Sequence, residues 1–268
     1  MNEGDAELQE YLDPLIGAAV ADQLEMKPTP NDETVLVTGT RLWTALNNAQ
    51  SWRNREAAAQ AYLNYLMAGV SKRFQHDTMK LFKASVIVSL TCCYDKLLQV
   101  YMLGLKILQA TFSEPICGPE ITAREMNREF LPFIKLLLTK VEELNFKVRD
   151  ETQHTLIAIF KNPKLDEGKI IEAIMEIVYK GPSPSKAPER IILGRLELLL
   201  YLLQQIGINE KNTWDYVQVL NELVVPSLLH QKSNVRWMAQ QIISVLYNIN
   251  GDPVKDIVQA GCQQLGVR

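Results

Sequence analysis

Apolar residues recur with a helical period of about 3.6 along nearly the whole chain. Runs in which apolar and polar residues alternate, the pattern of a half-buried strand, are nearly absent. Prolines fall between the periodic segments, where a missing backbone N–H does least harm. The pattern predicts an all-α protein with helices at residues 5–25, 33–48, 54–69, 76–93, 95–113, 122–143, 147–161, 167–180, 188–206, 212–229, 234–249 and 253–265.

Three of these helices share a register around an arginine: Arg55, Arg149 and Arg236. A small residue follows each arginine by three positions, and large apolar residues follow it by seven and eleven. The arginines lie 94 and 87 residues apart, which is about twice the 40 to 47 residues of a HEAT repeat. The spacing therefore predicts an α-solenoid of about five to six HEAT-like helical hairpins that form an elongated paddle. The aligned residues are Ala58, Thr152 and Ala239, then Tyr62, Leu156 and Ile243, then Leu66, Phe160 and Tyr247.

No low-complexity linker interrupts the chain, so we expect a single domain over residues 1–268. Residues 1–32 would supply an N-terminal helix and connection, 33–249 the repeats, and 250–268 a C-terminal capping helix. A short polar turn joins the two helices of each hairpin, and Ser51, Asn145 and Ser233 are candidate caps for the second helix. In a solenoid such turns form a row along one edge, where binding sites are common.

The charge is distributed unevenly between these turns and the rest of the chain. The net charge of −3 does not favour a nucleic-acid binder. The five turns at 49–56, 93–97, 145–150, 181–195 and 230–236 nevertheless carry +6 together, against −9 elsewhere. This basic edge suits an acidic protein partner. An alternative interpretation of Arg149 and Arg236 is structural, with each arginine pairing with an acidic residue of the neighbouring repeat.

Candidate chemistry is sparse. The four cysteines show no metal-binding spacing, the three histidines lie far apart, and no phosphate-binding or nucleophile motif is present. We expect no catalytic residue, no metal and no cofactor. No apolar run approaches the roughly 20 residues that span a bilayer, and the N-terminal residues lack the features of a signal peptide. We therefore expect a cytoplasmic, non-enzymatic protein that binds neither membrane nor nucleic acid.

Trp52 is the most informative single residue, because it precedes two arginines in the segment SWRNREAA. It could plug a gap between helices, since Phe146 occupies the same place in a later repeat. A buried plug would more simply be Leu or Val, and Trp and Arg are enriched at binding hot spots. We predict that Trp52 is exposed at a loop tip, and that Trp43, Trp214 and Trp237 serve mainly in packing.

The arrangement resembles a TOG domain, a HEAT-repeat family that binds tubulin through its row of intra-repeat turns. The resemblance begins near residue 33, and SWRNREAA is its most specific mark. Within the family, the chain is similar to the members found at ciliary tips and centriole ends, through DKLLQVYMLGLKILQ, KAPERIILGRLELLLYLL and NVRWMAQQIISVLY. The second turn, CCYDKLL, departs from the strongly basic form expected of a tubulin contact.

This resemblance implies a monomeric domain that binds αβ-tubulin at microtubule ends, in the cytoskeleton of a cilium tip, basal body or centriole. It implies that Trp52 packs against β-tubulin with the help of Arg53. The other residues assigned to the tubulin surface are Lys96, Lys147, Lys186, Lys232, Asn234 and Arg236. An armadillo-type or HEAT adaptor for another peptide or protein is the alternative, although the ladder of Asn and Trp residues usual in such grooves is missing.

Overall fold

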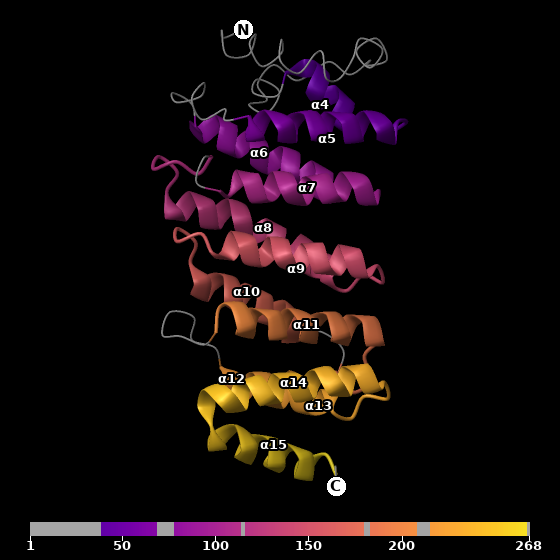
Figure 1. The fold of residues 1–268 in the computed structure, drawn as a ribbon, viewed down its shortest axis with the longest axis vertical. Coiled ribbons are helices and arrows are strands. Elements are labelled where there is room, and N and C mark those ends of the chain that lie inside the picture. Colours follow the sequence, from indigo (N-terminus) through magenta and orange to yellow (C-terminus); the bar gives the residue numbers. More distant parts are fainter. Residues whose placement is uncertain (1–38, 69–77, 114–115, 180–182, 208–214, 267–268) are drawn as a thin grey trace. The chain divides into compact units, whose positions relative to one another are not determined.

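The computed structural model describes residues 39–68, 78–113, 116–179, 183–207 and 215–266, and every regular element in these ranges is a helix (Figure 1). The predicted all-α class is therefore confirmed. The predicted helix at 5–25 and Trp214 lie outside the described residues.

Most helices begin and end within a few residues of their predicted bounds. The helix predicted at 33–48 is described only from Thr40, where α4 begins. The helices are α4 (Thr40–Leu46), α5 (Trp52–Met67), α6 (Thr78–Cys93), α7 (Leu98–Thr111), α8 (Ala123–Val141), α9 (Phe146–Phe160), α10 (Glu167–Tyr179), α11 (Glu189–Gln205), α12 (Tyr216–Val219), α13 (Val225–Ser227), α14 (Ser233–Asn250) and α15 (Asp252–Gln264).

The segment predicted as one helix at 212–229 contains a wider turn. A π-helical turn, η2 (Leu220–Val224), separates α12 from α13. At its end the N–H of Val225 donates to the carbonyl of Leu220, five residues earlier. Pro226 follows at once and has no N–H with which to continue the ordinary helical ladder.

The chain forms two compact units: Met1–Phe130 with Lys161–Lys164, and Leu131–Phe160 with Leu165–Arg268. In unit 1, α7 packs against both α5 and α6. Three phenylalanines pack against one another in its core. The ring centroids of Phe82 and Phe112 lie 5.6 Å apart in an edge-to-face arrangement, and those of Phe112 and Phe130 lie 5.2 Å apart with tilted rings. These aromatic contacts join α6, the end of α7 and α8, and so hold the first hairpins together.

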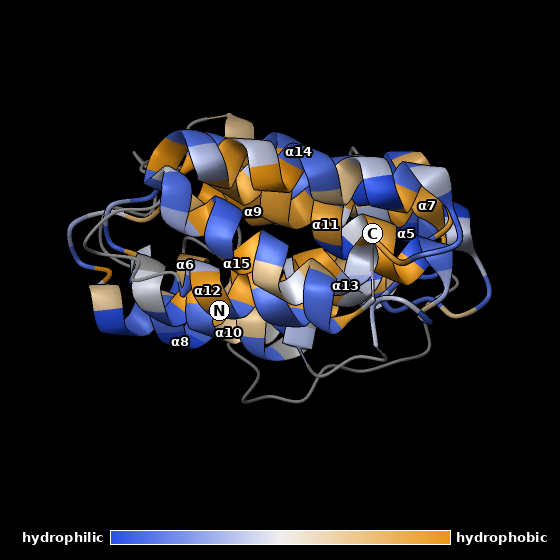
Figure 2. Ribbon diagram, turned by 90° about the horizontal axis from the view of Figure 1, so that it is seen from below, coloured by the Kyte–Doolittle hydropathy of each residue, from blue (hydrophilic) through white to orange (hydrophobic). Residues whose placement is uncertain are grey.

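Unit 2 has two helical layers. Helices α9, α11 and α14 lie in one layer and α10 and α12 in the other, with apolar sides facing inward (Figure 2). Helix α11 packs against α9 and α14. Because every second helix of a hairpin lies in the same layer, their outer sides form one continuous helical face within the unit.

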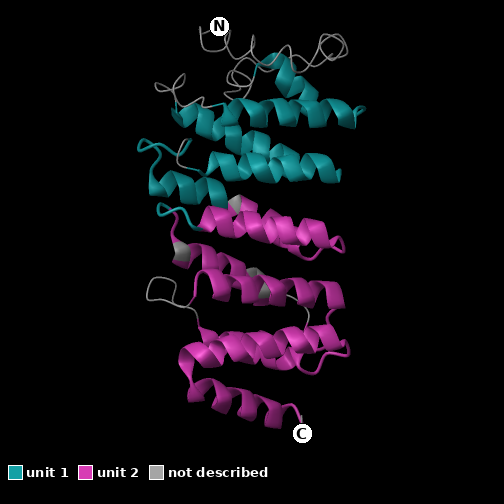
Figure 3. Cartoon of the chain, viewed as in Figure 1, with its two compact units in different colours: residues 1–130, 161–164 teal, residues 131–160, 165–268 magenta. Residues whose placement is uncertain are grey.

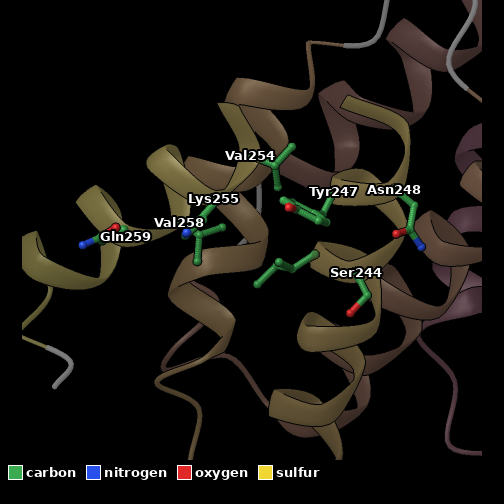
Figure 4. A pocket seen from close by; sticks show the side chains of 8 residues that line it. Ser244, Tyr247, Asn248, Val254, Lys255, Val258 and Gln259 are labelled. Atoms are coloured by element: carbon green, nitrogen blue, oxygen red, sulfur yellow. The ribbon is translucent and has the colours of Figure 1, made fainter. Parts of the chain in front are cut away.

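The aligned positions fulfil their predicted packing roles except at the last repeat. All three small residues after the repeated arginines are fully buried, and so are Tyr62 and Leu156. The prediction was wrong for Tyr247, which is 44% exposed. It borders a cleft of about 440 Å³ between α14 and α15, with Val254 and Val258 opposite (Figure 4). Since α15 covers the last repeat incompletely, Tyr247, eleven residues after Arg236, remains exposed to solvent.

One short connection is fixed by a lysine. Residues 161–164 follow α9 but belong to unit 1 (Figure 3). The ammonium of Lys164 donates to the carbonyls of Cys117, Gly118 and Ile121, at 3.2, 2.6 and 3.0 Å. Three charge-assisted bonds from one side chain anchor this connection to the segment between α7 and α8.

Gly194 permits a close contact between α11 and the end of α8. A Cβ added at this position in α11 would overlap the backbone carbonyl oxygen of Val141, at the end of α8. A backbone atom cannot move aside as a flexible side chain can. The two helices can approach this closely only because residue 194 has no side chain.

We predict that Gly194→Ala lowers the free energy of unfolding by about 1–2 kcal/mol, because the overlap with Val141 outweighs the gain in helix propensity. Urea unfolding followed by circular dichroism measures the change. Glu151→Ala, on an exposed position of α9, is the control and should stay within about 0.5 kcal/mol of the parent. Equal or greater stability of Gly194→Ala would contradict the close approach.

Candidate partner-binding turns

A repeated arginine closes three of the turns that join paired helices. In each, the guanidinium Nη1 donates to one or two backbone carbonyls five to seven residues earlier. These bonds run from Arg55 to Asn48 (2.8 Å), from Arg149 to Glu143 and Leu144 (3.1 and 3.3 Å), and from Arg236 to His230 and Gln231 (2.7 and 2.9 Å). The arginine thus satisfies carbonyls that the preceding helix leaves without an intrahelical partner.

Ion pairs connect these turns to the next hairpin. Arg55 binds Asp95 through two nitrogens, at 2.6 and 3.2 Å. In unit 2 the pairs are Arg149 with Glu197 (3.3 Å) and Arg195 with Glu142 (2.7 Å). The structural interpretation predicted for Arg149 is therefore confirmed. All of these side chains are at least three-quarters buried.

The first turn presents Trp52 to solvent. Its side chain is 40% exposed, as predicted, and the guanidinium carbon of Arg53 lies 5.6 Å from the centroid of its ring. Trp52 is the first residue of α5 and not part of the loop. Ser51 caps this helix by accepting a hydrogen bond from the N–H of Asn54 at 3.4 Å. The indole is thus held at a defined helix end.

The second turn belongs to unit 1 as well. Asp95 accepts a hydrogen bond from the N–H of Leu97 (2.9 Å) in addition to its two bonds from Arg55. Burial alone would raise the pKa of Asp95, but these hydrogen bonds hold it below its ordinary value. Lys96 is exposed beside Tyr94, which is 66% exposed. The ion pair fixes a turn that offers one cation and one aromatic ring.

The third turn, in unit 2, has the most exposed apolar side chains. Leu144 is 75% and Phe146 64% exposed, and Lys147 beside them is also exposed. Asn145 fulfils its predicted capping role, since its Oδ1 accepts a hydrogen bond from the N–H of Lys147 at 3.0 Å. The ring of Phe146 lies 5.7 Å from the guanidinium carbon of Arg149.

The fourth and fifth turns are bound to each other within unit 2. The buried ring of His230 contacts the carbonyl of Ala187 through Nε2 at 3.0 Å, and its Nδ1 accepts from the N–H of Lys232 at 3.1 Å. A nitrogen that accepts carries no proton, so Nε2 is the donor to Ala187. Lys186 lies exposed on the fourth turn, next to this contact.

Two predicted contact residues of the fifth turn take part in this internal network. Asn234 donates through Nδ2 to Glu189 on the fourth turn, and the Lys232 ammonium lies 4.0 Å from the same carboxylate. The prediction that Ser233 caps α14 was wrong, because the helix begins at Ser233 itself and Lys232 occupies the capping position.

The sequence prediction missed several exposed apolar residues. Trp237 was expected to pack inside, but it is 56% exposed one residue after Arg236. Tyr94, Leu144 and Phe146 were not proposed as contacts, although all are more exposed than Trp52. The recurrence of an aromatic residue three positions before Arg149, as at Trp52, was the available signal for Phe146.

The net charge of +6 summed over the turns overstates what a partner would meet. Arg55, Arg149 and Arg195 are engaged by carboxylates of the same unit. Exposed cations remain at Arg53 and Lys96 in unit 1, and at Lys147, Lys186, Arg190 and Lys232 in unit 2.

The family model described as "Centrosomal protein CEP104, TOG domain" matches residues 32–242. The chain belongs to the CEP104 TOG family. Two solved structures are similar to it, each with a TM-score of 0.64. The TOG domain of human Cep104 is 19% identical and matches over 84% of both chains. A second CEP104 TOG domain is 18% identical, over 86% of this chain and 90% of the other.

The fold is accordingly that of a HEAT-like helical solenoid, as the repeat spacing predicted. A comparison with curated proteins found no significant match. Among the described residues of this TOG-family chain, no helix has the length and apolar character needed to cross a bilayer. Within the same ranges, no cluster of three or more His, Cys, Asp or Glu side chains is arranged to hold a metal ion.

We predict that Asp95→Asn lowers the free energy of unfolding at pH 7 by about 2 kcal/mol, between the values for exposed and buried ion pairs. A carboxylate whose folded-state pKa is depressed stabilises the fold above its ordinary pKa of about 4, and this stabilisation disappears as the pH falls through the lower folded value. The difference between parent and variant should therefore shrink below about pH 4.

Urea unfolding between pH 3 and pH 7 tests this expectation. Asp256→Asn, on an exposed position of α15, is the control. A difference between parent and Asp95→Asn that is the same at every pH would show that the carboxylate charge contributes nothing.

Proposed function

We propose that the chain is a non-catalytic module that binds the αβ-tubulin heterodimer through its intra-repeat turns. TOG domains are tubulin-binding modules, and membership of the CEP104 TOG family supports this role. The observation that carries the proposal is that four of the five turns carry both a large exposed apolar side chain and an exposed cation. Trp, Tyr and Arg are enriched at binding hot spots, so their recurrence on exposed turns favours a binding surface.

In unit 1, the contact surface consists of Trp52 and Arg53 with Tyr94 and Lys96. The indole and phenol rings bury much area on binding for little loss of conformational entropy. Arg53 already lies close to the Trp52 ring, so it is partly ordered before a partner arrives. The Arg55–Asp95 pair lies between these turns and keeps their backbones in place.

In unit 2, the contact surface consists of Leu144, Phe146 and Lys147 on the third turn, Lys186 on the fourth, and Trp237 after the fifth. Arg236 serves the partner indirectly, by holding the carbonyls of its turn. Lys232 and Asn234 contact a partner only if they leave Glu189. Exposed lysines on the turns would speed association with a partner whose facing surface is acidic.

The proposed site of action is the microtubule end, in cilia or centrioles. Membership of a family named for a centrosomal protein supports this location. If several turns touch both tubulin subunits at once, a straight lattice would break that simultaneous fit, and the domain would select the curved heterodimer.

We predict that replacing both Trp52 and Arg53 by Ala raises the Kd for tubulin by about 30-fold or more, as loss of a hot spot of at least 2 kcal/mol requires. Co-elution with tubulin in size-exclusion chromatography at low salt provides a first measurement, and titration provides the Kd. Met67→Ala, at the opposite end of α5, removes a more exposed apolar side chain and is the matched control. Unchanged binding by the folded double variant would sink the proposal for the first turn.

A second pair of variants tests the residues in unit 2. Leu144→Ser with Phe146→Ser should weaken tubulin binding about tenfold, because two exposed apolar side chains lose their contact area. Trp237→Ser should also weaken tubulin binding. Leu265→Ser, at the exposed residue that follows α15, is the control. If both unit 2 variants bind like the parent, tubulin recognition is confined to unit 1.

A further inference from the structure

A small cavity lies in the second-helix layer of unit 2, beside the third turn, whose last residue, Asp150, lines it. It has a volume of about 200 Å³ and is lined by residues of α9, α11 and α14. Drug-sized ligands need pockets of about 300 Å³ or more, so this cavity has room for a single long side chain. The lining residues that matter here are Asp150, Gln153, His154, Glu197, Tyr201 and Met238.

Gln153 is the unusual residue of this cavity. It is only 8% exposed, yet among the described residues its Nε2 has no hydrogen-bond partner. An unpaired buried donor costs about 1–3 kcal/mol, and native structures contain few of them. An acceptor on a bound molecule, such as a peptide carbonyl, would satisfy this donor.

The two carboxylates that line the cavity, Asp150 and Glu197, favour a positively charged ligand group. Glu197 is already paired with Arg149, but burial and the nearby charge of Asp150 still raise its pKa, with Arg149 acting in the opposite direction. Asp150 lies 3.5 Å from the ring nitrogen Nδ1 of His154, and 43% of its side chain is exposed. A cation that enters the cavity would thus contact the accessible carboxylate of Asp150, with the carboxylate of Glu197 nearby.

The remaining walls suit a flat group on an aliphatic stem. The ring of Tyr201 packs edge-on against His154, with centroids 5.3 Å apart. Leu200 and Met238 supply apolar surface beside it. A guanidinium can stack on an aromatic face while it binds a carboxylate, which a compact ammonium does less well.

We propose that this cavity binds an arginine residue from an extended peptide segment of a protein partner. The guanidinium bonds to Asp150 over the ring of Tyr201, the aliphatic stem lies against Leu200 and Met238, and the peptide carbonyl of the same residue accepts the hydrogen bond from Gln153 Nε2. Asp150 ends the third turn, but none of the residues that bind the arginine is among those assigned to tubulin, so separate variants test the two assignments.

The test uses the whole chain, labelled with ¹⁵N, and acetyl-arginine-N-methylamide as the probe. This probe carries the guanidinium and the carbonyl, and a ligand of its size should bind with a Kd on the order of 1 mM. The side-chain amide signals of Gln153, identified by their loss in Gln153→Met, should shift and saturate. The citrulline analogue has the same shape without the charge and should bind at least fivefold more weakly.

Two variants separate the roles of the amide and the carboxylate. Gln153→Met keeps the volume but removes the donor, and Asp150→Asn removes the charge; each should weaken binding at least fivefold. Glu197 is left unchanged, because it also pairs with Arg149. Gln60→Met, on an exposed position of α5, is the control. Removing an unpaired donor should also leave Gln153→Met at least as stable as the parent.

Three results would overturn the proposal: no saturable shift at Gln153, equal binding of arginine and citrulline probes, or parent-like affinity in Gln153→Met. Shifts confined to residues outside α9, α11 and α14 would likewise assign the probe to another place. A well-dispersed spectrum for each variant establishes that loss of binding reflects the cavity and not unfolding.

Discussion

The repeated arginine at the start of the second helix is the contact on which the turns depend. Arg55, Arg149 and Arg236 each hold carbonyls of their own turn, and the first two also hold a carboxylate of the next hairpin. In Arg55 and Arg149, a single side chain therefore has two structural roles. It closes a loop locally, and it fixes the register between one helical pair and the following one. Trp52 and Phe146 are exposed, but each lies three residues before one of these arginines. The contacts of the arginine therefore fix the backbone that carries the exposed ring.

Rigid turns matter because exposed aromatic side chains on mobile loops would lose entropy on binding. Ser51 and Asn145 cap the helices that carry Trp52 and Phe146, so each ring projects from a helix end and not from a free loop. The π-helical turn η2 is also a local feature. It precedes Pro226, which has no N–H to donate, and it extends over a single turn of the helix.

The helices and the repeated register could be predicted because both depend on local periodicity. The small residues after each arginine are buried as their spacing predicted. Trp237 and Tyr247 were mispredicted because periodicity identifies a helix side but not whether another helix covers it. The ion pairs were also beyond sequence reasoning, since Arg55 and Asp95 are 40 residues apart and Arg149 and Glu197 are 48 apart. Basic residues counted as available to a partner were in fact neutralised inside the fold.

The lysine that anchors residues 161–164 has a consequence for any attempt to divide the protein. The chain leaves unit 1 after Phe130, returns to it for four residues at Lys161–Lys164, and then leaves again. No single cut in the polypeptide separates the two units, because a truncation at 130 would strip unit 1 of the ammonium that holds Cys117, Gly118 and Ile121. The two units are interleaved in sequence, so an evolutionary exchange of one unit would require three crossovers, after residues 130, 160 and 164.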